Sequence, residues 1–327
     1  MLSKALRYGT ISVLISLTGV LLLAAVMWLL PFKDMSPLAP PEATAPGFIV
    51  LGDWGEGDYR QRRVAALMEH ACRAGGVDFI QSVGDNFYPD GVQSPEDPFW
   101  QTHFEAIYDS TCLAQLPFYA AFGNHDYGGK PDAQLEYALA HPNRWKMPGA
   151  WYVHRHGLFT IAVLDTNQSI EAQRQFLHEA FTGDTSSWRI VAGHHNVRTL
   201  SAKYHDDVRL QQAILEDLKA LGVHFYLSGH SHNLQLLAYP GEPLYVVSGG
   251  GGKSPRGMLA DSQAPFLAVK NGFAALQFTD TEALVSFTVT SGEFLTSFAS
   301  ETVRFSIDRA CLSQVTGPEC IRRLPAI

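Results

Sequence analysis

Short apolar runs that end in a glycine and a polar side chain recur along the first two-thirds of the chain. Four have the length of a buried strand and lie at residues 48–51, 79–83, 190–192 and 224–227, with a fifth at 117–122. Between them, apolar residues repeat at helical spacing in the ranges 59–74, 96–108, 171–180 and 208–221. Strands that alternate with helices in this way predict an α/β fold.

Beyond residue 232 the pattern becomes rich in strands. Apolar and polar positions alternate or run together over 234–239, 244–248, 273–279, 283–290 and 293–298. A hairpin of 151–154 and 158–164 is expected to continue the first half of the sheet. The later strands predict a second sheet packed on the first within one domain.

The N-terminus carries an uncharged apolar segment from residue 11 to residue 30. At about 1.5 Å per residue it is long enough to cross a hydrocarbon core of roughly 30 Å. Lys4 and Arg7 precede it, which predicts a cytoplasmic N-terminus and an exported remainder. A cleaved signal peptide is the alternative, and it also exports the chain. We therefore expect a transmembrane or signal segment at 1–30, a proline-rich linker at 31–47 and a catalytic domain at 48–327.

Composition limits the kind of partner and the cellular compartment. The formal net charge of -8 argues against nucleic acid, which requires a concentrated basic face. Four cysteines fit an exported location where disulfides persist. Cys311 and Cys320 are the expected bridge, while Cys72 is either a buried thiol or paired with Cys112.

Candidate chemistry lies in the glycine-punctuated clusters that follow the strands. Together they supply seven oxygen and nitrogen side chains, namely Asp53, Asp85, Tyr88, Asn124, His194, His230 and His232. Such ligands suit iron, manganese or zinc in a hydrolytic centre. Two cations about 3.5 to 4 Å apart can share one carboxylate and clamp a phosphoryl group. Asp85 is the candidate bridge, and a phenolate from Tyr88 favours a strongly acidic ion such as Fe(III).

These clusters carry a family resemblance. The motifs Asp53-x-Gly, Gly84-Asp85-x-x-Tyr88, Gly123-Asn124-His125-Asp126, Gly193-His194 and Gly229-His230-x-His232 resemble those of the purple acid phosphatases, within the calcineurin-like metallophosphoesterase superfamily. The small tartrate-resistant, uteroferrin-like form is the most similar. Most of the superfamily carries Asp-x-His in the first motif. Here Gly55 occupies that histidine position while Tyr88 appears, which is typical of the purple type.

The resemblance implies two packed mixed β-sheets flanked by helices, the metallophosphoesterase sandwich. It places Asp53, Asp85, Tyr88 and His232 on Fe(III), and it places Asp85, Asn124, His194 and His230 on Fe(II), Zn(II) or Mn(II). His125 would contact phosphate and help to protonate the leaving oxygen. The second substrate-facing histidine departs from the family pattern: Lys203 falls at its offset, and His205, two residues later, is the candidate.

The resulting hypothesis is an acid phosphatase that hydrolyses small phosphomonoesters by attack of a metal-bound hydroxide. A phosphodiesterase or nucleotide hydrolase with the same metal core is one alternative. A non-hydrolytic iron-binding or redox protein is another. Substrate profiling separates the first alternative from the hypothesis, and metal occupancy without phosphatase turnover would indicate the second.

Overall fold

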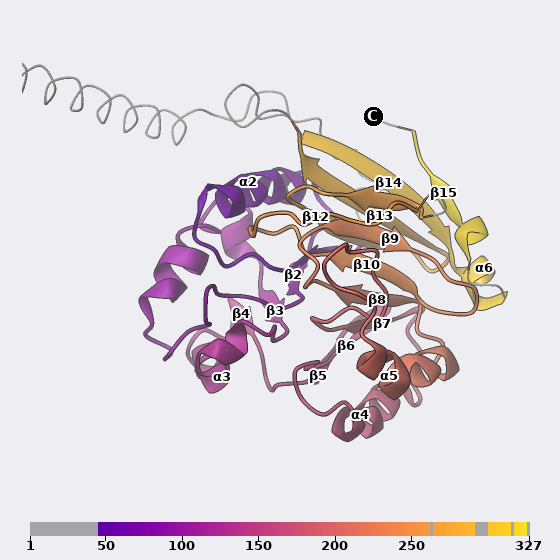
Figure 1. Ribbon diagram of the computed structural model, residues 1–327, viewed down its shortest axis with the longest axis horizontal. Coiled ribbons are helices and arrows are strands. Elements are labelled where there is room, and N and C mark those ends of the chain that lie inside the picture. Colours follow the sequence, from indigo (N-terminus) through magenta and orange to yellow (C-terminus); the bar gives the residue numbers. More distant parts are fainter. Residues whose placement is uncertain (1–44, 262–263, 292–299, 315–316, 326–327) are drawn as a thin grey trace, which may run out of the picture. The chain divides into compact units, whose positions relative to one another are not determined.

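The computed structural model describes residues 45–261, 264–291, 300–314 and 317–325 (Figure 1). The apolar segment at 11–30 and the strand expected at 293–298 lie outside these residues. Within the described ranges, no helix has the length and apolar character needed to span a membrane.

The larger sheet, called sheet A, has the strand order β15-β14-β13-β12-β1-β2-β3-β4. Its strands are β1 (Gly47–Leu51), β2 (Phe79–Ser82), β3 (Phe118–Ala120), β4 (Trp145–Lys146), β12 (Gly272–Phe278), β13 (Glu282–Thr290), β14 (Ser300–Asp308) and β15 (Ile321–Arg323). β1 to β4 are parallel, whereas β12 to β15 pair in antiparallel fashion. Sheet A is therefore mixed.

The second sheet, called sheet B, has the order β11-β9-β10-β8-β7-β6-β5. Its strands are β5 (Tyr152–His156), β6 (Phe159–Val163), β7 (Trp188–Ala192), β8 (Phe225–Ser228), β9 (Leu234–Leu237), β10 (Leu244–Ser248) and β11 (Phe266–Ala268). β6, β7, β8 and β10 are parallel, and the outer strands are antiparallel. Sheet B is mixed as well.

Helices accompany both sheets. The α-helices are α2 (Tyr59–Ala74), α3 (Pro131–Ala140), α4 (Glu171–Phe181), α5 (Val208–Ala220) and α6 (Arg309–Gln314). A π-helix lies at Trp100–Glu105, and 3-10 turns lie at Leu113–Gln115, Asp126–Gly128 and Pro318–Cys320. Figure 1 shows α2 beside β12 and the pair α4 and α5 beside β6 to β8. Apolar residues of α4 and α5 form one buried cluster with the outward residues of sheet B.

An aromatic core joins the two sheets at the amino ends of their parallel strands. The ring of Phe48 on β1 lies 4.9 Å from that of Phe79 on β2 and 5.3 Å from that of Phe159 on β6. Phe278 contacts both Phe159 and Trp188, with centroid distances of 4.9 and 5.4 Å. These side chains are buried. Their packing fixes one end of the sandwich and leaves the carboxyl ends of the strands to carry polar loops.

Strand register brings those carboxyl ends level with one another. Leu51 of β1 pairs with Ser82 of β2, and Ala192 of β7 pairs with Leu227 of β8. Because each strand stops at about the same height, the loops that follow emerge along one edge of the sandwich. This is the place where open α/β sheets bind ligands.

The fold class expected from sequence is confirmed: two packed mixed sheets are flanked by helices. Helices expected at 59–74, 171–180 and 208–221 match α2, α4 and α5. The helix expected at 96–108 shortens to the π-helix at Trp100–Glu105, and α3 was not expected. The hairpin β5–β6 was expected to continue the first sheet, and this was wrong: it joins sheet B, while β12 pairs with the free edge of β1.

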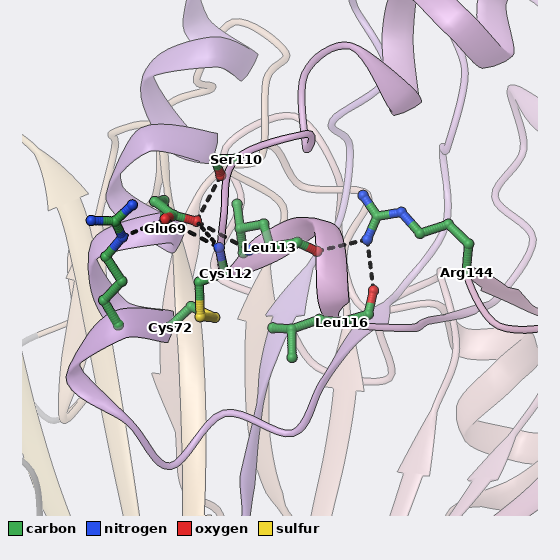
Figure 2. Close-up of a disulfide and its surroundings, with 8 residues drawn as sticks. Glu69, Cys72, Ser110, Cys112, Leu113, Leu116 and Arg144 are labelled. Carbon is green, nitrogen blue, oxygen red and sulfur yellow. Dashed lines mark hydrogen bonds and ion pairs between the residues drawn. A yellow bond between two sulfur atoms is a disulfide. The ribbon is translucent and has the colours of Figure 1, made fainter.

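Two disulfides are present, Cys72–Cys112 and Cys311–Cys320. The second is the expected bridge, and the first resolves the alternative left open for Cys72. Cys72–Cys112 closes a sequence separation of 40 residues. Loop-closure entropy gives such a bridge about 4 kcal/mol of stabilisation. It joins α2 to the 3-10 turn at Leu113–Gln115 (Figure 2).

Two charged side chains hold the turn that this disulfide anchors (Figure 2). The Glu69 carboxylate accepts hydrogen bonds from the Ser110 hydroxyl at 2.7 Å and from the backbone N–H groups of Cys112 and Leu113 at 3.1 and 3.0 Å. The Arg144 guanidinium donates to the carbonyl of Leu113 at 2.7 Å, and it also donates to that of Leu116. The free N–H and C=O groups of the short turn are thus satisfied at both ends.

A histidine that is kept neutral in the folded protein makes the fold sensitive to acid, and half-buried His224 allows a test. Burial, with the charges of Arg309 and Arg189, lowers the pKa of His224 to about 4. An unfolded histidine titrates near 6.5, so this stabilisation is complete above about pH 6.5 and is lost as the pH falls towards 4. We expect His224→Asn, which keeps an acceptor for the Arg189 N–H, to lose roughly 2 kcal/mol less stability between pH 7 and pH 4.5 than the wild type. Denaturant unfolding at both pH values measures this.

The control for this test is His141→Asn, which replaces an exposed histidine. Its pH dependence of unfolding should follow the wild type. An equal change in both variants would show that the effect comes from net charge rather than from burial of His224.

Candidate metal centre

One group of four buried side chains meets at the carboxyl ends of β1, β2 and β8. The Tyr88 hydroxyl lies 2.8 Å from Asp85 Oδ2, 3.3 Å from Asp53 Oδ1 and 3.4 Å from His232 Nε2. His232 Nε2 is 3.2 Å from Asp53 Oδ1. One ligand atom from each of Asp53, Asp85 and His232 lies within 4.8 Å of the others, a spacing that can hold a metal ion.

A second group adjoins the first through Asp85. His194 Nε2 lies 3.1 Å from Asn124 Oδ1, 3.1 Å from His230 Nδ1 and 3.5 Å from Asp85 Oδ1. The Asp85 carboxylate therefore turns one oxygen to each group. His194 is fully buried, while Asn124 is exposed and His230 is half-buried. The second group consequently forms the open side of the centre.

Four of these side chains stand on left-handed backbone. The φ angles are 57° at Asp53, 52° at Asp85, 62° at His230 and 50° at His232. Such angles are uncommon outside glycine and asparagine, and they cluster at functional sites. Each ligand is thus turned sharply out of its strand. The neighbouring glycines serve close approach, since a Cβ on Gly123 would lie 2.1 Å from the Asp85 nitrogen.

Gly55 occupies a position that no side chain can fill. A Cβ there would lie 1.8 Å from the carbonyl oxygen of Asn86 and 2.6 Å from the Cα of Phe87. The Gly55 carbonyl accepts a hydrogen bond from the Tyr88 N–H at 2.9 Å. The backbone that presents Tyr88 therefore runs through the space that a histidine at residue 55 would need.

The buried acidic side chains of the first group favour binding of a cation. Burial raises the pKa of the Tyr88 phenol well above its usual value, and the charges of Asp53 and Asp85 raise it further. Burial also acts to raise the pKa of the Asp53 carboxyl, but the charge and hydrogen bond of His232 lower it below its usual value. Two carboxylates buried side by side repel one another unless a positive charge lies between them. The donor set thus fits a hard, strongly acidic metal ion.

Asp126 ties the two ligand loops together. Its buried carboxyl accepts hydrogen bonds from the N–H groups of Asn86 at 3.0 Å and Gly123 at 2.7 Å, and from the Gln134 side chain at 2.9 Å. Burial, with the charge of Asp85, raises the pKa of Asp126 to about 7. The sequence placed Asp126 in a motif without indicating its role, which is to hold the loops of Asp85 and Asn124 in register.

His125 lies at the half-buried rim of the centre. The ring centroid of His125 is 4.5 Å from that of Tyr88, and the backbone N–H of His125 donates to Asp85 Oδ1 at 2.9 Å. The ring Nδ1 lies 2.6 Å from the Pro89 carbonyl oxygen, so Nδ1 carries the proton. That tautomer leaves Nε2 available to a ligand.

The loop expected to supply a second histidine places a different residue against the centre. The Tyr204 ring centroid is 4.1 Å from that of His230, while His205 is exposed. The Arg256 guanidinium carbon lies 4.9 Å above the Tyr204 ring. Sequence reasoning did not select Tyr204 or Arg256, and the only signal was the departure at Lys203.

Two mixed sheets with an acidic and histidine-rich cluster at one edge define the metallophosphoesterase class of α/β proteins. The family model of calcineurin-like phosphoesterases matches residues 47–234. Purple acid phosphatase 17 of Arabidopsis thaliana is 31% identical over 280 residues, which cover 76% of this chain and 82% of the relative. The chain belongs to the calcineurin-like phosphoesterases and, within them, to the purple acid phosphatases.

Other known proteins agree in sequence or in fold. Tartrate-resistant acid phosphatase type 5 of Homo sapiens is 29% identical over 320 residues, which cover 85% of this chain and 95% of the relative. The yellow lupin (Lupinus luteus) purple acid phosphatase PPD1 superposes with a TM-score of 0.60 at 16% identity, over 80% of this chain and 54% of that one. GAP50 of Plasmodium, the anchor in the inner membrane complex, superposes with a TM-score of 0.66 at 23% identity, over 77% of this chain and 87% of that one. The two structures share the fold with this chain.

Proposed function

We propose that this protein is a dinuclear-metal acid phosphatase that hydrolyses small phosphomonoesters. The observation that carries the proposal is the Asp85 carboxylate, which turns Oδ2 to Tyr88 at 2.8 Å and Oδ1 to His194 at 3.5 Å. A carboxylate between two groups of ligands suits a pair of adjacent cations, and such pairs clamp a phosphoryl group. The names of the relatives support the same activity.

The two ligand groups would hold different ions. Asp53, Asp85, Tyr88 and His232 would hold Fe(III), because a buried phenol with a raised pKa yields its proton only to a strongly acidic cation. Neutral Asn124, His194 and His230 would hold Fe(II), Zn(II) or Mn(II), with Asp85 shared. When bound, such ions polarise the phosphoryl oxygens and lower the pKa of water.

The side chains of the protein orient the ligands and the substrate. The Val83 carbonyl lies 3.0 Å from His194 Nδ1, so Nε2 faces Asn124 with its lone pair free. His125 presents Nε2 at the open rim, where it can hold a proton for the leaving oxygen of a phosphomonoester. Asp126 keeps both loops in place. His205 stays a candidate for a second proton donor, although it is exposed and the Tyr204 ring is the one that contacts His230.

The wider organisation follows from the same proposal. The two disulfides suit an exported enzyme, anchored or released by the segment at 1–30, with its catalytic domain at 48–327. A phosphomonoester preference distinguishes it from a diesterase with the same core. We expect kcat/KM for p-nitrophenyl phosphate at acid pH to exceed that for bis(p-nitrophenyl) phosphate.

The test of the metal assignment is the visible absorption of the purified, oxidised protein with iron analysis, compared with Tyr88→Phe. A tyrosinate bound to Fe(III) gives a charge-transfer band, so we expect the wild type to be coloured and the variant to lose the band. The variant removes only one oxygen from a side chain that is 3% exposed. It should therefore remain folded, as circular dichroism would show.

Tyr137→Phe is the matched control, because Tyr137 is also buried and donates its hydroxyl to a carboxylate, Glu105, at 2.8 Å. It should keep the colour. A colourless wild type with two zinc or manganese ions and full activity would remove the iron assignment and leave the hydrolase. Full metal occupancy without turnover of p-nitrophenyl phosphate would contradict the proposed function itself.

A further inference from the structure

Arg256 lies at the open side of the centre and is fixed there by backbone contacts. Its N–H donates to the His232 carbonyl at 3.0 Å, and its own carbonyl accepts from the Asn233 side chain at 3.3 Å. These bonds attach the loop that follows Gly249–Gly252 to the loop that carries His230 and His232. The position of Arg256 is therefore coupled to that of the candidate metal ligands.

One aromatic ring, that of Tyr204, lies between the Arg256 guanidinium and the second ligand group. Its carbon lies 4.9 Å from the Tyr204 ring centroid, which is 4.1 Å from the ring centroid of His230. Lys203 adds a second positive charge, with its Nζ 5.1 Å from the same Tyr204 ring.

Several cations of the chain have acidic partners, whereas Arg256 has none among the described residues. Arg198 pairs with Glu242 at 2.6 Å and with Asp206 at 2.9 Å, and Lys253, three residues before Arg256, pairs with Glu56 at 2.5 Å. Arg256 forms no ion pair within the described ranges, and its Nη1 is buried without a hydrogen-bond partner there. A buried donor without an acceptor is unfavourable, and the guanidinium fork matches phosphate oxygens.

We propose that Arg256, supported by Tyr204 and Lys203, is a specificity-determining residue that binds the second phosphoryl group of diphosphate substrates. This inference rests on the proposed function. The metal centre would take the phosphoryl group that reacts, and Arg256 the one that leaves. Water adds its oxygen to the first phosphorus, the bridging P–O bond breaks, and the bridging oxygen departs with the second phosphorus, so that pyrophosphate and water give two orthophosphates.

The experiment compares pyrophosphate with p-nitrophenyl phosphate in the metal-loaded enzyme and in Arg256→Ala. Loss of a charge-assisted, forked contact should lower kcat/KM for pyrophosphate about 10- to 100-fold. The value for p-nitrophenyl phosphate, whose leaving group carries no second phosphate, should change by less than about twofold. Arg256→Lys keeps the positive charge but lacks the forked guanidinium. Its kcat/KM for pyrophosphate should therefore lie between the values of the wild type and Arg256→Ala.

Lys219→Ala is the control for charge, since it removes one cation that pairs with Glu216 on α5. It should leave the ratio of the two kcat/KM values unchanged. An equal fall for both substrates in Arg256→Ala, or no fall for pyrophosphate, would overturn the inference.

A binding measurement separates failure of this inference from failure of the proposed function. Calorimetry should show that Arg256→Ala weakens methylenediphosphonate about tenfold or more relative to inorganic phosphate. If the wild type hydrolysed neither substrate, the proposed function would fail, but the ratio of the affinities for methylenediphosphonate and inorganic phosphate would still decide the role of Arg256. The same affinity ratio in the wild type and in Arg256→Ala would overturn the inference. Thermal unfolding would verify that the variant is folded.

Discussion

Asp85→Asn should reduce kcat/KM for p-nitrophenyl phosphate at least about 1000-fold. The substitution keeps the shape of the side chain but removes the negative charge that faces both ligand groups. Two metal ions held close together repel one another unless a carboxylate lies between them, and each supplies several kcal/mol of transition-state stabilisation. Since 1.36 kcal/mol is a factor of ten in rate, loss of either ion gives an effect of this size. Steady-state kinetics and metal analysis of the same preparation measure it.

The control for Asp85→Asn is Asp217→Asn. Asp217 is buried too, but it pairs with Arg174 at 2.6 Å on the helices that cover sheet B. Its loss should affect stability more than turnover. Normal activity of Asp85→Asn, or normal content of both metals, would show that Asp85 does not bridge the two ligand groups.

The candidate ligands could be predicted from sequence because local rules govern them. Each follows an apolar run that ends in glycine, and parallel strands deliver their carboxyl ends to one edge. Asp53 and Asp85 follow β1 and β2, whose register is Leu51 with Ser82. The resulting proximity needs only the assumption of a parallel pair, which the intervening helix α2 supports.

Sheet partners could not be predicted in the same way. β1 pairs with β12, which lies more than 200 residues further along the chain, and the hairpin β5–β6 lies in sheet B. Apolar strands of similar length offer similar pairing surfaces, so periodicity does not distinguish the possible neighbours. The choice depends on side-chain packing between the sheets, such as that of Phe48 against Phe159.

The side chains at the open side of the centre also could not be predicted from local sequence patterns. Lys203, Tyr204 and His205 are consecutive, and a shift of one residue decides which side chain faces His230. The contact of Arg256 with Tyr204 joins loops more than 50 residues apart. The sequence indicated that the motif with the second histidine departs here from its family. Which side chains take its place depends on the path of two irregular loops, which the sequence does not reveal.

Gly55→Ala should lower kcat/KM about 100-fold and remove much of the tyrosinate colour, although the residue contacts no substrate. The added Cβ would lie 1.8 Å from the Asn86 carbonyl oxygen and 2.6 Å from the Phe87 Cα. Both residues are fully buried, and Asp126 binds both of their N–H groups, at 3.0 and 3.3 Å. Overpacking of this kind costs about 1 to 3 kcal/mol or more, and a displacement of about 1 Å at a catalytic site reduces rates about 100-fold.

The backbone that must move is the one that presents Tyr88, since the Tyr88 N–H donates to the Gly55 carbonyl. We therefore expect a shifted or weakened absorption band, a lower iron content and a melting temperature several degrees below that of the wild type. Gly257→Ala is the matched control, because its Cβ would meet only the Ala202 side chain, at 3.9 Å. A Gly55→Ala protein with unchanged colour and activity would show that the loop from Asn86 to Tyr88 yields readily, and that the absence of a side chain at residue 55 is not what allows Tyr88 to reach Asp53 and Asp85.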